Sequence, residues 1–189
     1  MFGGAGSDRL YADQEQETSE VYLTGETGEG TGARGDLLSG KEDDDQLYAG
    51  AGNDVLAGGS GADVIYGGAG DDTIEGDANP QWTYAEPWSV TRTVTEQDGV
   101  TLYHREYRGV AWEDLGEEQG DDVIYAGSGA DWVFAQGGND FVDAGIGDDV
   151  VFGEGGDDII LGQAGNDVLN GDDKDTPAEE QGDDYLDGG

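Results

Sequence analysis

The sequence predicts an all-β fold, a flattened right-handed roll in which short parallel strands stack coil upon coil. Two observations predict it: the 189-residue chain repeats a pattern of nine residues, and 37 of its residues are Gly. In register, the second half of the chain reads AGSGADWVF, AQGGNDFVD, AGIGDDVVF, GEGGDDIIL and GQAGNDVLN. A fixed short repeat is typical of solenoids, in which each coil packs only against its neighbours.

The first six residues of each repeat are expected to form a turn and the last three a strand. Gly at positions 1, 2 and 4 admits positive φ, and Asn or Asp at position 5 tolerates the same region. Positions 7 to 9 are rich in Val, Ile, Leu and aromatic residues, so the side chain at position 8 is expected to point into the core. Two repeats per coil then make two parallel sheets, in which each strand pairs with the strand 18 residues further on.

The charge of the chain restricts what it can bind. Its 45 Asp and Glu outnumber 7 Lys and Arg, for a formal net charge of -38. A compact chain with this charge repels itself unless it binds cations, and it is a poor partner for nucleic acid or anionic lipid. No apolar run reaches the roughly 18 residues that cross a membrane, and the first residues do not read as a signal peptide. We therefore expect no nucleic-acid partner and no membrane insertion.

The repeat resembles the RTX (haemolysin-type) calcium-binding nonapeptide, GGxGxDxUx, where U is a large aliphatic residue. Further copies read AGAGNDVLA, GGSGADVIY and GGAGDDTIE, and every copy has Asp at position 6 and a large aliphatic residue at position 8. The resemblance implies a parallel β-roll that folds on Ca²⁺. It also implies a secreted or cell-surface location, reached by type I secretion.

In that family calcium lies between turns one coil apart, bound by position-6 carboxylates and backbone carbonyls. The resemblance therefore implies about ten sites in two series. The odd-numbered repeats would contribute Asp8, Asp54, Asp72, Asp131, Asp149 and Asp167. The even-numbered repeats would contribute Asp45, Asp63, Asp122, Asp140, Asp158 and Asp184.

Backbone carbonyls of the turns would complete an all-oxygen shell, which suits Ca²⁺ better than Zn²⁺ or Cu²⁺. The residues implied to supply them are Gly4, Gly6, Ala49, Gly50, Ala51, Gly52, Gly58, Gly59, Ser60, Gly61, Gly67, Gly68, Ala69, Gly70, Gly76, Asp77, Ala78, Gly120, Ala126, Gly127, Ser128, Gly129, Ala135, Gln136, Gly137, Gly138, Ala144, Gly145, Ile146, Gly147, Gly153, Glu154, Gly155, Gly156, Gly162, Ala164, Gly171 and Asp173.

The repeat is interrupted in three places. The stretch EEQGDD occurs twice, at residues 117–122 and 179–184, each time where a split turn resumes. We predict inserts at residues 15–42, 79–119 and 174–181, within a single roll of about twelve repeats that spans residues 1–189. The split repeats are the second, sixth and twelfth, so all three inserts are predicted on one edge of the roll. Every split turn has Asp at position 2, namely Asp13, Asp77 and Asp172. None of the uninterrupted turns has Asp at this position.

Two stretches of the inserts have patterns of their own. In the second insert, Trp88 to Glu96 alternates, Gln97 to Gly99 is a turn signal and Val100 to Tyr107 returns, so a β-hairpin is predicted. In the first, TGARGDLLS from Thr31 could be a degenerate repeat or part of the insert, and the sequence leaves this open.

The outward positions 7 and 9 of the roll are unusually apolar. This predicts that insert 79–119 packs on the roll, or that a partner such as a glycan or another surface ligand covers it. The lone His104, in a chain without Cys and without a Ser-His-Asp set, predicts no catalytic site. The outward apolar residues are Trp132, Phe134, Phe141, Val150, Phe152, Ile159 and Leu161.

Together these features predict a calcium-binding structural module of a larger secreted bacterial protein, with the rest of the parent chain as its covalent neighbour. Two other functions remain open. The chain could be an adhesin-type binding module that uses its inserts, or an accessory segment of a secreted RTX enzyme or toxin.

Overall fold

The computed structural model describes residues 2–4, 9–11, 34–82, 89–97, 99–108, 110–113, 119–172 and 181–189. Every helix-or-strand assignment among these residues is a β-strand, and none is a helix. The chain divides into two compact units, Met1–Asn79 with Leu115–Gly189, and Pro80–Asp114. The larger unit contains the repeats. No described helix is long and apolar enough to cross a membrane.

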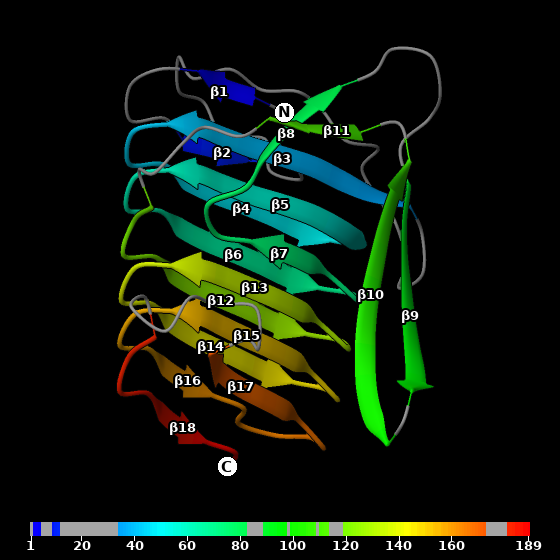
Figure 1. Cartoon of the computed structure of the whole chain (residues 1–189). Coiled ribbons are helices and arrows are strands. Elements are labelled where there is room, and N and C mark those ends of the chain that lie inside the picture. Colours follow the sequence, from blue (N-terminus) through cyan, green and yellow to red (C-terminus); the bar gives the residue numbers. More distant parts are fainter. Residues whose placement is uncertain are drawn as a thin grey trace. The chain divides into compact units, whose positions relative to one another are not determined.

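The larger unit contains two parallel sheets of seven strands each (Figure 1). Sheet A consists, in spatial order, of β1 (Phe2–Gly4), β3 (Arg34–Glu42), β5 (Asn53–Ser60), β7 (Thr73–Glu75), β13 (Trp132–Gly137), β15 (Val150–Gly155) and β17 (Val168–Asp172). Sheet B consists of β18 (Tyr185–Asp187), β16 (Ile159–Leu161), β14 (Phe141–Ile146), β12 (Val123–Ser128), β6 (Val64–Ala69), β4 (Gln46–Ala51) and β2 (Arg9–Tyr11). Consecutive strands of the repeats alternate between the sheets, which confirms the predicted parallel roll.

The register of the sheets stacks equivalent positions of the repeat. Leu56 pairs with Ile74 in sheet A, and Ile124 pairs with Val142 in sheet B. The side chains at position 8 point inward from both sheets and pack together as the core, as predicted. Ten of them are 0 to 1% exposed: Leu38, Leu47, Leu56, Ile65, Ile74, Ile124, Val133, Val142, Val151 and Ile160.

The first predicted insert is wrong for its last nine residues. Residues 34–42 form β3, where Leu38 pairs with Leu56 and is 1% exposed. TGARGDLLS therefore supplies a repeat strand, and GKEDDDQLY continues from it without interruption. The pattern was obscured because Lys41 and Asp43 stand where other turns have Gly, with φ of 102° and 73°. Burial of Leu38 and strand pairing hold these residues in a conformation that Gly adopts more easily.

The extra repeat changes which turns carry the interruptions. The connection from β2 to β3 leads from sheet B to sheet A. The interruptions after Asp77 and Asp172 lead from sheet A, at β7 and β17, to sheet B. The prediction that all three inserts share an edge is therefore wrong for the first, whose Asp13 lies outside the described residues.

The smaller unit contains an antiparallel hairpin of β9 (Ser89–Gln97) and β10 (Val100–Arg108), as the alternating pattern predicted. Val100 pairs with Gln97, and Gly99 in the turn has a φ of 81°. β8 (Asn79–Trp82) pairs with β11 (Val110–Glu113) in a second two-stranded sheet.

The two outer faces of the roll differ in exposure. On sheet A, Trp132, Phe134 and Val150 are buried. On sheet B, Ile159 is 45% and Tyr185 57% exposed. Sheet B also has a ladder in which Tyr48, Tyr66 and Tyr125 stack with ring centroids 4.8 and 5.0 Å apart. Packing of insert 79–119 on the roll stays a prediction.

Replacing Leu38 by Ala tests the reassigned repeat. The substitution should lower the free energy of unfolding by about 2 to 5 kcal/mol, because it leaves a cavity in the core. Urea unfolding in saturating Ca²⁺ measures it, with Val100→Ala on the exposed hairpin as the control. Equal stability of the two variants would place Leu38 outside the core.

Candidate metal sites at the turns

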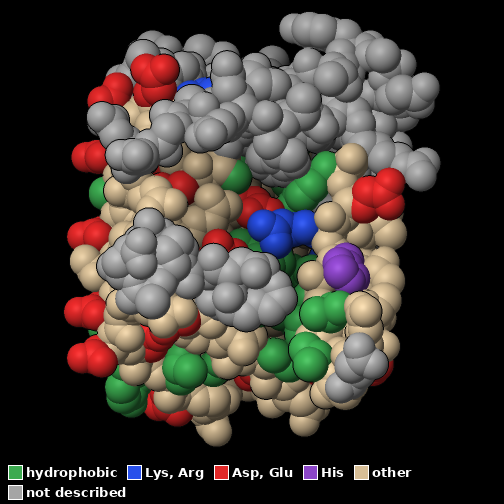
Figure 2. Space-filling model, viewed as in Figure 1, with side chains coloured by type: hydrophobic (Ala, Val, Ile, Leu, Met, Phe, Trp, Pro, Cys, Tyr) green, Lys and Arg blue, Asp and Glu red, His purple; other side chains and the backbone are tan. Residues whose placement is uncertain are grey.

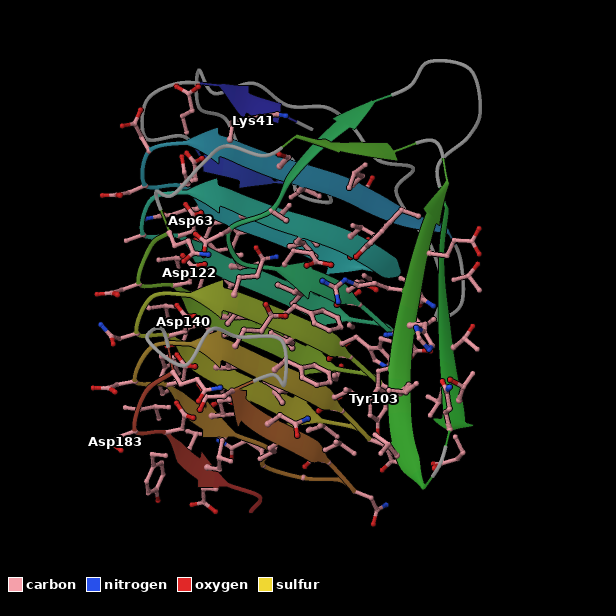
Figure 3. The ribbon with its side chains drawn as sticks, in the orientation of Figure 1. Lys41, Asp63, Tyr103, Asp122, Asp140 and Asp183 are labelled. Atoms are coloured by element: carbon pink, nitrogen blue, oxygen red, sulfur yellow. The ribbon has the colours of Figure 1, made fainter. Side chains whose placement is uncertain are left out.

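Each turn of the roll brings a position-6 Asp to the end of the strand that follows it. Figure 3 shows Asp63, Asp122 and Asp140 one above another along one edge of the roll. The turns that lead into sheet B align Asp45, Asp63, Asp122, Asp140, Asp158 and Asp184. The turns that lead into sheet A align Asp36, Asp54, Asp72, Asp131, Asp149 and Asp167.

In ten of these carboxylates, all except Asp36 and Asp45, Oδ1 joins neighbouring coils. The backbone N–H of Asp63 donates to Asp122 Oδ1 at 2.8 Å, and the N–H of Asp122 donates to Asp140 Oδ1 at 2.8 Å. The same bond joins Asp54 to Asp72 at 2.8 Å on the other edge. Oδ1 is therefore held by the coil before it.

In five of these carboxylates the other oxygen is buried without a hydrogen-bond donor. This is so for Oδ2 of Asp63, Asp122, Asp140, Asp158 and Asp167. Burying a charged oxygen without a hydrogen bond is costly, so such atoms in a repeating pattern indicate a cation ligand.

The space beside Oδ2 is lined by backbone of the same turn. A Cβ atom placed on Gly58 would lie 2.2 Å from Asp63 Oδ2, and one on Gly153 would lie 2.1 Å from Asp158 Oδ2. The described residues contain no group of three or more His, Cys, Asp or Glu that could hold a metal ion. An ion at these turns would therefore need backbone carbonyls besides the carboxylates, and a shell made only of oxygen fits Ca²⁺. The individual carbonyl ligands stay a prediction.

Burial and like-charged neighbours both oppose ionisation of four carboxylates in the series that leads into sheet B. Burial is the largest cause and raises the pKa of Asp122 to about 10 and that of Asp140 to about 8. The pKa of Asp63 rises to about 7 and that of Asp158 to about 6 for the same reason. A cation beside Oδ2 would offset this cost by favouring the ionised form.

The predicted series need one correction at their start. Arg9 pairs with Gln46 and Leu10 with Leu47, so the repeat that contains Asp8 stacks on the repeat of Asp45 and not on that of Asp54. Asp8 itself lies outside the described residues. The residue aligned with Asp54 is Asp36, whose N–H donates to Asp54 Oδ1 at 2.5 Å. Sequence reasoning missed Asp36, although the Gly-Asp pair within TGARGDLLS marked it.

The roles predicted for the turn glycines also need correction. Positive φ occurs at positions 2 and 4, as at Gly50 and Gly52 with 115° and 127°. Positions 1 and 5 of the described turns do not adopt it. Gly at position 1 instead allows the close approach of Oδ2 described above.

Position 5 forms a second ladder, which sequence reasoning did not anticipate. The N–H of Asn139 donates to Asp121 Oδ1 at 2.7 Å, and the N–H of Asp157 donates to Asn139 Oδ1 at 2.9 Å. These side chains are exposed, unlike those at position 6. Figure 2 shows acidic side chains along this edge of the roll, where Figure 3 labels Asp183 of the same ladder. The ladder therefore needs no ion to compensate for burial.

A family model of the RTX calcium-binding nonapeptide repeat matches residues 1–15, 30–65, 50–79, 118–151 and 143–173. The matches span well over half of the chain, and they include the reassigned repeat at residues 31–39. The chain belongs to the RTX repeat family and is a calcium-binding repeat module. No curated protein matches the chain.

The pKa shifts predict how the metal-free chain responds to pH. Because burial raises the pKa of Asp63, Asp122 and Asp140 above the ordinary value of 3.8, the folded state binds more protons than the unfolded state. Stability is therefore greatest below about pH 4 and falls as the pH rises through about 7 to 10. Circular dichroism of the metal-free chain should show more β-structure at pH 5 than at pH 8.

The Asp122→Asn variant is the control, because it removes the titrating group with the largest of these shifts and should flatten the dependence. Greater folding at pH 8 than at pH 5 without metal would contradict the prediction.

Proposed function

We propose that this chain is a calcium-dependent folding module of a larger secreted bacterial protein. Ca²⁺ outside the cell binds between successive turns, and the roll folds as the sites fill. The observation that carries the proposal is the column of buried position-6 carboxylates, whose Oδ2 atoms at Asp63, Asp122 and Asp140 accept no hydrogen bond.

The charge of the chain supports a link between folding and ion binding. A net charge of -38 opposes compaction, and the carboxylates of neighbouring coils raise one another's pKa. Each bound ion offsets part of this repulsion. A site filled at 100 times its dissociation constant contributes about 2.7 kcal/mol to the stability of the folded state. Many such sites in one stack make calcium a condition of folding.

The difference in Ca²⁺ concentration between the cytosol and the extracellular medium supports folding outside the cell. Extracellular calcium modules bind with dissociation constants of about 0.1 to 1 mM, and cytosolic Ca²⁺ leaves such sites empty. The chain would then remain unfolded until it reaches an extracellular medium. This agrees with the family, whose members are typically secreted.

The proposal assigns no catalytic activity to the module. His104 lies exposed on the hairpin, where its Nε2 is 3.2 Å from Thr95 Oγ1.

A calcium titration of the metal-free chain at pH 8, followed by circular dichroism, tests the proposal. We expect the β-sheet signal to appear cooperatively with calcium, to disappear on chelation, and to respond weakly to Mg²⁺, because a smaller ion demands a stricter geometry. A full β-sheet signal in excess chelator at this pH would show that calcium is not required.

Two substitutions in one turn separate the ion site from surface charge. Asp122→Asn should raise the calcium concentration at the folding midpoint about tenfold or more, because losing one ligand charge weakens the sites on both sides. Asp121→Asn is the matched control, since the Asn keeps an oxygen for the N–H of Asn139 and its side chain is exposed. Equal midpoints for the two variants would remove position 6 from the ion site.

A further inference from the structure

The split turn at Gly76–Ala78 and Gly120–Asp122 keeps the arrangement of an uninterrupted turn. The N–H of Asp63 reaches Asp122 Oδ1, and Asp122 Oδ2 is buried like its neighbours. A Cβ atom on Gly76, before the interruption, would lie 2.4 Å from Asp122 Oδ2, after it. Two segments separated by residues 79–119 therefore meet as one turn.

Five uninterrupted turns have a backbone bond at position 4 that the split turn lacks. There the N–H at position 4 donates to the carbonyl at position 3 of the next coil. Five turns make this bond: Gly52 to Ala69 at 2.8 Å, Gly70 to Ser128 at 2.7 Å, Gly129 to Ile146 at 2.9 Å, Gly138 to Gly155 at 3.0 Å and Gly147 to Ala164 at 2.9 Å.

In the split turn a side chain replaces this backbone bond. The N–H of Gly120, at position 4, donates to Asp77 Oδ1 at 2.9 Å. The N–H of Gly137, at position 3 of the next coil, donates to Asp77 Oδ2 at 3.1 Å. The Asp77 carboxylate thus joins the returning segment and the next coil to the segment that leaves.

The backbone at Asp77 differs from that at other second positions. In the uninterrupted turns this residue has positive φ, for example 83° at Gln136 and 69° at Gln163, whereas Asp77 does not. β7 also ends at Glu75, whereas β5, β13 and β15 extend to position 3 of the following turn. The backbone leaves the roll after Asp77, whereas the Asp77 side chain remains hydrogen-bonded within the turn.

The second split turn repeats part of this arrangement. Asp172 occupies the same position, without positive φ, and its Oδ1 is buried with no hydrogen-bond partner. A Cβ atom on Gly171 would lie 1.8 Å from Asp184 Oδ2, so these halves also meet. In both split turns, an Asp at position 2 places a carboxylate oxygen inside the turn.

We propose that Asp77 is a positioning residue that closes the interrupted turn and so preserves the calcium sites on both sides of Asp122. Asp at position 2 then marks a place where a repeat can release a long insert without losing its ion sites. The calcium part of this inference rests on the proposed function, whereas the closure of the turn does not.

Asp77→Gly, which installs the usual residue of position 2, tests the proposal in the full chain with saturating Ca²⁺. Amide hydrogen exchange, read by NMR, should become about tenfold or more faster at Gly120 and Gly137, because both donors lose a charged acceptor. A calcium titration followed at the amides of Asp63, Asp122 and Asp140 should show weakened binding at these residues and not at Asp54 or Asp149. Unchanged exchange at Gly120 and Gly137 would overturn the proposal.

Two further variants keep the test decisive if Asp77→Gly fails to fold. Asp77→Asn retains Oδ1 for Gly120 but offers an NH₂ group to Gly137, so exchange should accelerate at Gly137 alone. Gln163→Gly makes the matching change in an uninterrupted turn and should leave the exchange of Gly120 and Gly137 as in the wild type. Protection of both amides in Asp77→Asn would show that the carboxylate is not needed.

Removal of residues 79–119 should reverse the effect of Asp77→Gly on the thermal midpoint. Joining Ala78 to Gly120 restores an uninterrupted turn, in which position 2 needs positive φ. Asp77→Gly should then raise the thermal midpoint, whereas it lowers the midpoint in the intact chain. The same sign in both backgrounds would overturn the proposal. A wild-type chain that folds but binds no calcium would overturn the proposed function alone, because amide exchange tests the closure independently.

Discussion

The roll depends on the buried carboxylate at position 6. One of its oxygens accepts the N–H of the preceding coil, as Asp122 does from Asp63 at 2.8 Å, so the coils from Asp36 to Asp184 are bonded to one another through ionisable groups. The other oxygen of Asp122 is removed from water and meets no donor. Burial raises the pKa of Asp122 to about 10, and a cation beside its Oδ2 would favour the ionised form. This cost of burying charge is the physical basis of the link between folding and ion binding that we propose.

Two ladders of opposite direction connect neighbouring turns, and the ladder at position 5 is interrupted at Ala62 and Ala130, whose side chains cannot accept a hydrogen bond. At position 6 the side chain accepts from the earlier coil, whereas at position 5 it accepts from the later one, as Asp121 does from Asn139 at 2.7 Å. Each turn is thus held from both sides. Because a coil touches only adjacent coils, these bonds and the core contacts at position 8 transmit stability along the stack. The Asp77 carboxylate maintains this continuity where the backbone leaves the roll.

Sequence reasoning succeeded where the type of a residue and its position in the repeat together allow only one structural role. Leu56 and Ile124 occupy position 8, which is a large aliphatic residue in every copy of the repeat, and both are fully buried. It failed at residues 34–42, because Lys41 and Asp43 stand where Gly was expected. That one missed repeat changed the alternation of all earlier repeats between the sheets. It placed Asp8 beside Asp54, whereas the register stacks its repeat on that of Asp45.

The sequence by itself determined the period, the strands, the inward position 8 and the carboxylate at position 6, because these follow from the conformation and polarity of neighbouring residues. Only the tertiary structure decided which coil stacks on which and that Asp77 bonds Gly120 and Gly137. It also decided that Trp132 on sheet A is buried while Ile159 on sheet B is exposed. These features depend on pairing between residues far apart in the chain. Such pairing is set by strand register and by the donors that a turn leaves unsatisfied, neither of which is visible within a single repeat.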